Sequence, residues 1–215
     1  MTEAPHSDRS EIRRLPDRGS YDRTTIHAIL DEALICHVGF LDDGGRPVVI
    51  PTIHARVGEV LYLHGSPASR MLRALRGRRD VSVTATLVDG MVLAKSQFHH
   101  SLNYRSVVLF GSAREVTDAD EKMTAFRAIV EHLVPGRSAG SRPANEKELR
   151  GTAVTAIDIE EASAKQRTGP PVDDEADLDL PYWTGVIPLR IESGELEPVD
   201  STPVPDHVRN WESHK

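Results

Sequence analysis

The sequence predicts an α+β fold built on a mainly antiparallel barrel or curved sheet of six or more strands. Short segments of alternating apolar residues follow one another with turn signals at hairpin spacing, and helical patterns are inserted between them. The sequence has no internal repeat and no glycine-rich phosphate loop of the dinucleotide or nucleoside-triphosphate kind. A chain of 215 residues can bury one substantial core and does not require two domains.

The first half of the chain predicts one helix followed by an antiparallel meander. Asp22 is a plausible N-cap, and the apolar residues from Ile26 to Ala33 fall on one face of the helix that follows. The stretch LDDGGRP (41–47) is a hairpin signal. The further elements expected here are strands at 34–41, 48–57 and 60–65 and a helix at about 67–77, with Ser66 as its N-cap.

The second half predicts more strands and a clear amphipathic helix that Asp118 caps. A turn is expected at Asp89-Gly90, between two strands within residues 81–96. The other elements expected are a long strand at 104–116, a short helical turn that ends at Gly151, one strand at 152–166 and a last core strand at 182–193.

The pattern divides the chain into a flexible N-terminal arm (1–20), one domain (21–200) and a C-terminal tail (201–215), because prolines and polar residues dominate both ends. The acidic run DDEADLDL (173–180) is either a solvated loop or a lid over a cleft, since it directly precedes Trp183.

Composition limits the classes of function. The formal net charge of −7 argues against a general nucleic-acid binder, and the basic run RALRGRR (73–79) is typical of a solvated helix end. No apolar run approaches the length of a membrane span, and the N-terminus lacks an apolar signal region. A single cysteine, Cys36, lies in the apolar run ALICHVGF and is expected to be a buried structural thiol. We therefore expect a cytoplasmic protein with no nucleic-acid or membrane partner.

One stretch, LYLHGSPASRML (61–72), predicts an anion site at the junction of a strand and a helix. A helix start exposes unpaired backbone N–H groups, and Ser69 and Arg70 fall in its first turn. Arginine can bind phosphate through two parallel N–H bonds, while Gly65 and its small neighbours let a ligand approach the backbone. The alternative is a capped helix with a solvent-facing arginine.

The sequence resembles the FMN-binding split-barrel proteins, specifically the pyridoxamine 5′-phosphate oxidase-like group that includes the nitroimidazole-resistance proteins. The matching pieces occur in order over roughly residues 20–195: ICHVGFLDDGGRPVVIPTIHA, VLYLHGSPASRM, NYRSVVLFGSAREV and AKQRTGPPVDDEADLDLPYWTGVIPL. The resemblance implies a mainly antiparallel six-stranded split β-barrel with flanking helices. It also implies a homodimer with one FMN in each of two clefts at the subunit interface.

The resemblance assigns roles to particular residues. Ser69 and Arg70 would hold the FMN phosphate, while His64 and Gly65 flank the ribityl chain or ring, and Ser66 belongs to the same cofactor-binding segment. Backbone groups of Ile50–Ile53 would bind the edge of the isoalloxazine ring. The remaining expected cofactor contacts, some of them from the partner subunit, are Ile50, Pro51, Thr52, Ile53, Tyr104, Arg105, Ser106, Lys165, Arg167 and Trp183. By the same resemblance, His64 is the candidate catalytic histidine near the flavin.

The sequence also departs from the pyridoxamine phosphate oxidases. Those enzymes have a further cation directly after the serine–arginine pair, where this chain has Met71, and their substrate-phosphate cluster has no match here. Pyridoxamine phosphate is therefore not the expected substrate.

The histidines do not predict a metal site. His99 and His100 are adjacent and so point to opposite faces of a strand, and no close-spaced set of Cys, His and carboxylate residues occurs. Three histidines on successive strands could converge in a barrel: His37, His54 and His64. The resemblance to split-barrel proteins, some of which bind haem, implies that one of the three could serve a haem.

The function expected is that of an FMN-dependent oxidoreductase in which reduced flavin passes electrons or hydride to a small acceptor, nitroaromatic or quinone-like. The protein then contributes binding and electrostatics, because the redox chemistry belongs to the cofactor. The alternatives are a flavin- or haem-binding storage or sensor module without turnover, and a deazaflavin-dependent reductase.

Overall fold

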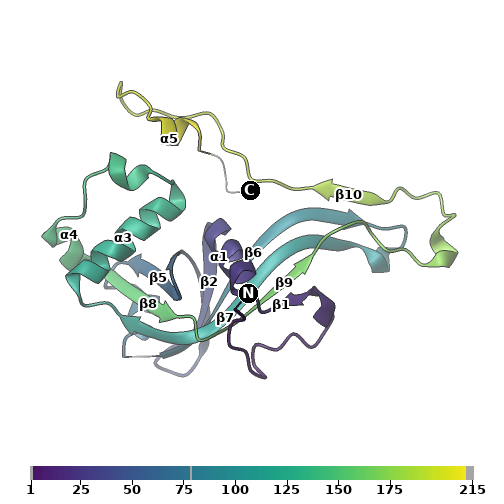
Figure 1. Cartoon of the computed structure of the whole chain (residues 1–215), viewed down its shortest axis with the longest axis horizontal. Helices are drawn as coiled ribbons and strands as arrows, with labels where there is room; N and C mark the ends of the chain where they lie inside the picture. Colours follow the sequence, from purple (N-terminus) through teal and green to yellow (C-terminus); the bar gives the residue numbers. More distant parts are fainter. Residues whose placement is uncertain (1, 78, 212–215) are drawn as a thin grey trace.

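The structure is a computed structural model that describes residues 2–77 and 79–211. Its centre is an antiparallel barrel of six strands in the order β3-β2-β6-β7-β8-β5 (Figure 1). Strands β3 and β5 contact each other across the seam, where the described residues form no ladder between them. The six strands are β2 (Ile35–Leu41), β3 (Pro47–Ile53), β5 (Val60–Gly65), β6 (Arg79–Leu93), β7 (Ser101–Glu115) and β8 (Ala153–Asp158). The expected α+β split barrel is confirmed.

The barrel interior is filled by alternate residues of each strand. On β2, Cys36, Val38 and Phe40 are buried, whereas Ile35 and Leu41 face outward and are exposed. This alternation follows from the two-residue period of a strand. Helix α1 (Arg23–Glu32) adds Ile26, Ile29 and Leu30 to the same core. The expected amphipathic helix is therefore part of the barrel's hydrophobic core.

The helix starts at Asp22 and Asp118 are confirmed. The Asp22 carboxylate accepts a hydrogen bond from Thr25 N at 3.0 Å, and that of Asp118 accepts one from Glu121 N at 2.8 Å. The second of these begins helix α3 (Ala119–Leu133), which covers the outer face of β5 and β8 at the left of Figure 1. Helix α4 (Glu146–Gly151) follows, with a capping box at Asn145.

Three expected element boundaries are wrong. The N-cap of helix α2 is Ser69, not Ser66, and the helix is only Arg70–Ala74. It starts late because residues 66–69 form a turn in which Ser69 N donates to Ser66 O. Residues 48–57 break at His54 into β3 and the short strand β4 (Ala55–Val57). Residues 152–166 form two strands, β8 and β9 (Glu161–Arg167), since the chain turns after Asp158.

Strands β6 and β7 continue beyond the barrel as a two-stranded arm, seen at the right of Figure 1. The turn expected at Asp89-Gly90 is wrong, because β6 passes through it with a β-bulge between Val88 and Gly90. The last strand, β10 (Gly185–Pro188), pairs with the arm portion of β6, so it is not a core strand. A 3₁₀ turn at Gln97–His99 connects β6 to β7, and another at Glu175–Asp177 precedes β10.

The two ends of the chain lie against the domain at defined points. Ala4 N donates to Tyr21 O, and β1 (Gly19–Ser20), after a 3₁₀ turn at Pro16–Arg18, pairs with β9. A flexible arm at 1–20 stays a prediction. At the other end, Trp211 Nε1 donates to Leu133 O, which brings the short helix α5 (Asp206–Arg209) to the end of α3, near a 3₁₀ turn at Arg137–Gly140. Residues 212–215 of the tail, and Arg78 of the basic run, lie outside the described residues.

Candidate functional site

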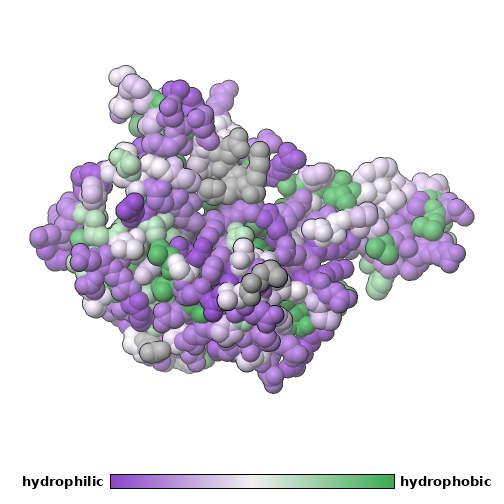
Figure 2. All heavy atoms as spheres, in the orientation of Figure 1, coloured by the Kyte–Doolittle hydropathy of each residue, from purple (hydrophilic) through white to green (hydrophobic). Residues whose placement is uncertain are grey.

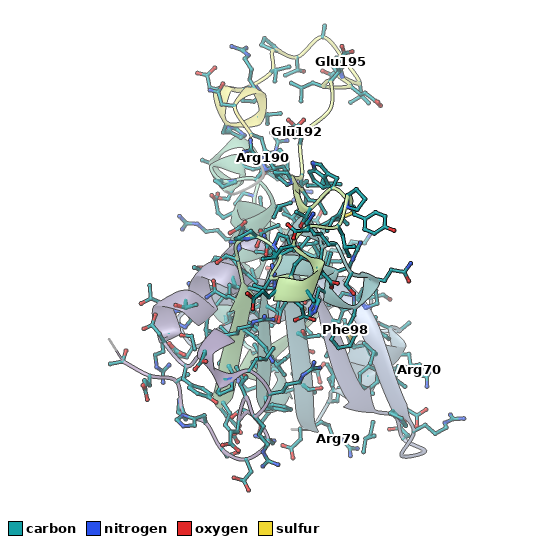
Figure 3. All side chains as sticks on the ribbon, turned by 90° about the vertical axis from the view of Figure 1, so that its right-hand side faces the viewer. Arg70, Arg79, Phe98, Arg190, Glu192 and Glu195 are labelled. Atoms are coloured by element: carbon teal, nitrogen blue, oxygen red, sulfur yellow. The ribbon has the colours of Figure 1, made fainter. Side chains whose placement is uncertain are left out.

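Arg70 lies at an arginine-rich cavity of about 390 Å³, between the β2–β3 turn and helix α2. The cavity is lined by Asp42, Asp43, Gly44, Arg46, Arg70, Arg73 and Ala74. Figure 3 shows Arg70 and Arg79 on the lower part of the barrel, away from the labelled tail residues Arg190, Glu192 and Glu195 at the top of the view. The predicted anion-binding arginine is thus at an open cavity that is lined by three arginines and two aspartates.

The small residues expected beside this arginine form the loop before α2. Ser69 caps the helix by accepting a hydrogen bond from Leu72 N at 3.5 Å, and Ser66 accepts one from Ala68 N at 3.2 Å. Gly65 ends β5, and a side chain there would approach Leu72 to 3.2 Å. The structure therefore brings Gly65, Ser66, Ser69 and Arg70 together in one short segment.

Asp42 holds the cavity together, although its sequence context indicates only a hairpin. Its Oδ1 accepts hydrogen bonds from the backbone N–H groups of Gly44 and Arg46, both at 3.0 Å. Its Oδ2 accepts from Arg46 Nε at 3.0 Å and from Arg70 Nη2 at 2.7 Å. The bonds from Arg46 and Arg70 hold the pKa of Asp42 well below its usual range. The sequence signal for this role of Asp42 is an aspartate and an arginine, Asp42 and Arg46, that lie four residues apart across a turn.

The segment Ile50–Ile53 lies on β3, the edge strand beside the cavity. Strand β3 starts at Pro47, directly after the turn, so Ile50–Ile53 lie about 10 to 20 Å along the strand from the turn at about 3.3 Å per residue. The outer edge of β3 pairs with no other strand among the described residues. Backbone groups on this edge, which faces the seam with β5, form no ladder and are the candidates to bind a ligand that starts at Arg70.

Arg105 is engaged within the protein. It donates to both carboxylate oxygens of Glu32 on α1 and to Asp89 on β6, with an Nη2–Oδ1 distance of 2.7 Å to the latter. These hydrogen bonds raise the pKa of Arg105 above its ordinary value. Its neighbour Ser106 donates to Lys165 O at 3.2 Å, and Tyr104 is half-buried on the opposite face of β7 from Arg105. Arg105 thus ties α1 to the sheet, and a contact of Tyr104, Arg105 and Ser106 with the flavin stays a prediction.

The two cations on β9 are also engaged. Lys165 Nζ donates to Arg14 O of the N-terminal segment at 2.6 Å. Arg167 is buried and donates to Asn103 and to the carbonyls of Gly169 and Pro170. The structure does not bring either residue to the cavity at Arg70.

His64 lies under helix α3. Its ring packs edge-on against Phe126 at a centroid distance of 6.1 Å, and its Nδ1 is buried without a hydrogen-bond partner in the described residues. Burial lowers the pKa of His64. His64 does not line the cavity at Arg70, and its catalytic role stays a prediction.

Trp183 lies far from Arg70 in the same chain. Strand β6 has 15 residues and so spans about 45 Å at about 3.3 Å per residue. Asp42, which binds Arg70, follows β2 next to the Arg79 end of β6, because Gly39 pairs with Ser82. Trp183 lies at the other end, where Thr184 donates to Leu93 O at 3.0 Å. One flavin mononucleotide is too short to contact both Arg70 and Trp183 of a single protomer.

The outer face of the barrel strands β3, β2, β6 and β7 is mixed: β2 and β3 present mainly apolar residues, whereas β6 presents Ser82, Thr84 and Thr86. Val49, Ile35 and Val108 are exposed on it. His37 is exposed near its centre, paired in register with Thr84 on one side and Pro51 on the other. The three histidines that could converge do not share one site. His37 is exposed, His54 is buried with its Nε2 2.8 Å from Leu30 O, and His64 lies under α3.

In the described part of the chain, no group of three or more His, Cys, Asp or Glu side chains is placed to hold a metal ion. The described helices are all too short or too polar to cross a membrane.

Comparison with known proteins identifies the family. The family model described as pyridoxamine 5′-phosphate oxidase matches residues 22–166, two thirds of the chain. The chain belongs to the pyridoxamine 5′-phosphate oxidase family. None of the curated proteins matched the chain.

Two solved structures of this family are similar over almost their whole length. The flavocytochrome Anf3 from Azotobacter vinelandii is 40% identical, with a TM-score of 0.88, 98% of this chain covered and 99% of that chain. A FAD- and haem-binding protein from Mycobacterium smegmatis is 35% identical, with a TM-score of 0.85 and coverage of 91% and 97%. A 5-nitroimidazole antibiotic resistance protein from Bacteroides thetaiotaomicron is 23% identical over 68% of this chain and 85% of its own, with a TM-score of 0.57, which shows a shared fold.

Proposed function

We propose that this protein is a flavin-binding electron-transfer protein whose cofactor phosphate binds at Arg70 and whose isoalloxazine ring lies along β3. One observation carries the proposal: the arginine-lined cavity lies at the start of β3, and the unpaired edge of this strand carries Ile50 about 10 Å further on. A guanidinium suits a phosphate, and a free strand edge supplies N–H and C=O groups for the polar rim of a flavin.

The form of the flavin is the first point to test. The sequence led us to expect FMN, whereas the name of the Mycobacterium smegmatis relative specifies FAD. Arg46 and Arg73 line the same cavity as Arg70, and they provide positive charge for a second phosphate. We therefore propose FAD or FMN at one site. Heat release of the bound flavin and its chromatography against both standards identify it, and a protein that neither contains nor binds flavin contradicts the proposal.

A haem is the second proposed cofactor. The Azotobacter relative is named a flavocytochrome and the Mycobacterium relative a haem-binding protein, at 40% and 35% identity. His37 would be the residue that binds the haem iron, because it is exposed on the outer sheet face next to the apolar residues of β2 and β3. A haem bound there would supply one-electron chemistry. A Soret band in the purified wild-type protein would show bound haem. If His37→Ala loses this band and keeps its flavin, the result supports haem binding by His37. If the variant keeps the band, His37 does not bind the haem.

A homodimer is proposed from the exposed apolar surface. Phe98 is 87% exposed and Trp183 is 66% exposed on the arm, where Figure 2 shows separate hydrophobic patches among hydrophilic side chains at the right of the view. Large exposed apolar patches mark interaction sites. Because Trp183 lies too far from Arg70 of its own chain, the proposed contact of Trp183 is with the flavin of a partner. Light scattering with size-exclusion chromatography measures the mass, and a monomer of 23.7 kDa at micromolar concentration contradicts this arrangement.

The proposed activity is the transfer of electrons from the reduced flavin to a small acceptor, with nitroaromatics and quinones as candidates. The residues of this chain bind and orient the cofactor, since no acid or base faces the cavity except the bonded Asp42 and the exposed Asp43 among the described residues. Anaerobic reduction with NADH or NADPH, followed by reoxidation with a nitroaromatic or a quinone, tests turnover. A loaded protein that is neither reduced nor reoxidised would support the storage or sensor alternative.

A further inference from the structure

Asp42 is the least exposed charged group of the arginine cavity. Its side chain is 8% exposed, whereas those of Arg46 and Arg70 are 77% and 55% exposed. The carboxylate therefore forms the floor of the cavity, and the two guanidinium groups extend from it towards solvent. An exposed arginine would otherwise sample many rotamers.

The two oxygens of Asp42 have different partners. Oδ1 accepts only backbone N–H groups of the β2–β3 turn, at 3.0 Å from Gly44 and Arg46. Oδ2 accepts from the two guanidinium groups, with Arg70 Nη2 at 2.7 Å and Arg46 Nη2 at 2.9 Å. One oxygen thus shapes the turn, and the other orients the cations.

We propose that Asp42 is a positioning residue for the cofactor phosphate: its Oδ2 fixes Arg70 in the orientation in which the remaining N–H groups of the guanidinium meet a phosphate. The guanidinium has five N–H donors, and the structure uses one of Nη2 for Asp42. The other donors remain for a phosphate that enters from the cavity. This inference rests on the proposed flavin site.

Positioning and competition predict opposite effects for Asp42. If Asp42 only competed with a phosphate for Arg70, its removal would strengthen phosphate binding, because one negative charge would be lost. If Asp42 orients Arg70, its removal weakens binding, because the side chain must then be ordered when the ligand binds. The sign of the change therefore decides between the two.

Asp42→Asn separates these effects with little change to the turn. The amide oxygen of asparagine can keep the two backbone hydrogen bonds that Oδ1 accepts, while its NH₂ group replaces Oδ2 and cannot accept from either arginine. Asp43→Asn is the matched control. It removes the same charge from the same cavity, yet Asp43 has no hydrogen bond or ion pair in the described structure.

The experiment titrates FMN and riboflavin, which lacks the phosphate, into the full chain freed of flavin and follows flavin fluorescence. Asp42→Asn is expected to weaken FMN binding about three- to tenfold and to leave riboflavin binding unchanged. Asp43→Asn should leave FMN binding unchanged or slightly tighter. In an Arg70→Ala background, Asp42→Asn should have a smaller effect on FMN, because Arg46 is then the one arginine left that Asp42 orients.

Three results would overturn the inference: FMN binding to Asp42→Asn that equals or exceeds the wild-type affinity, an equal loss for riboflavin, or an undiminished effect without Arg70. A wild-type protein that binds neither flavin contradicts the proposed function itself. If Asp42→Asn does not fold, Arg70→Lys provides the test, since the turn keeps all its bonds. Lysine keeps the charge without the planar fork, so FMN binding as weak as that of Arg70→Ala supports positioning, and wild-type affinity refutes it.

Discussion

The rings of His54 and His132 lie 4.8 Å apart, centroid to centroid, between β4 and helix α3. His54 is fully buried and its Nε2 lies 2.8 Å from Leu30 O, while His132 Nε2 lies 3.0 Å from Ala33 O. The two histidines therefore connect the end of α1 to α3. Two imidazolium groups at this distance would repel each other, so the arrangement favours the neutral ring of His54.

Acid should destabilise the fold through His54. Burial, together with the neighbouring His132, lowers the pKa of His54 to about 4 from an ordinary value of 6.5. Between pH 6.5 and about 4 the unfolded chain binds a proton that the folded chain does not, so stability falls as the pH falls through this range. The loss is on the order of 3 kcal/mol at full extent.

Urea unfolding at pH 7.5, 6 and 4.5 measures this effect. His54→Gln removes the titration while its amide can still donate to Leu30 O, so its stability should vary less with pH than that of the wild type. Equal pH dependence in the two proteins would show that His54 does not contribute. The comparison of slopes is needed because other groups titrate in both proteins.

Replacement of Arg70 by alanine should weaken FMN binding by about 1.5 to 3 kcal/mol, the usual value of a hydrogen bond to a charged group. Arg76→Ala is the control, because Arg76 follows the same helix, lies 3.6 Å from Glu115 and does not line the cavity. Isothermal titration or fluorescence quenching gives both affinities. Similar losses for the two variants would mean that only the general charge of this region matters.

Gly111→Ala should prevent stable folding. A Cβ at Gly111 would lie 1.8 Å from the backbone oxygen of Asp158, so two strands of the barrel would have to separate. We expect a loss of more than about 4 kcal/mol of unfolding free energy, seen as insoluble protein or a strongly lowered Tm. Gly151→Ala, at the end of α4, has no atom within 4 Å of the added Cβ and should melt like the wild type. A soluble Gly111→Ala protein with an unchanged Tm would contradict the packing described for β7.

Cys36 should be unreactive in the folded protein. It is fully buried on β2, and burial raises the pKa of its thiol to about 12. Ellman's reagent should therefore titrate no thiol at pH 8 until denaturant is added, after which one equivalent should react. Rapid reaction of the native protein would show that β2 opens to solvent.

Much of the fold could be predicted from the sequence because its local signals agree with the final packing. Asp22 and Asp118 cap helices as expected, and the alternation around Cys36 places that residue in the core. The turn at Asp89-Gly90 could not be excluded, since a bulge and a hairpin use the same residues and only the pairing of β6 with β7 distinguishes them.

The candidate site was predicted in part. The segment from Gly65 to Arg70 was identified because a helix start and an arginine are local signals. The partners of Arg105 and Arg167 were not identifiable, because Glu32, Asp89 and Asn103 meet them only through the tertiary fold. The sequence around an arginine or a lysine does not show whether a carboxylate or carbonyl of the same protein binds that side chain.

The length of β6 has a genetic consequence. If Arg70 at one end and Trp183 at the other serve the same flavin from different chains, two defective proteins can complement each other. A mixed dimer of Arg70→Ala and Trp183→Ala chains would contain one site with both residues intact and one site with neither. Co-expression of the two alleles would then restore full affinity to as many as half of the flavin sites if every dimer is mixed, whereas each allele alone would have only weakened sites.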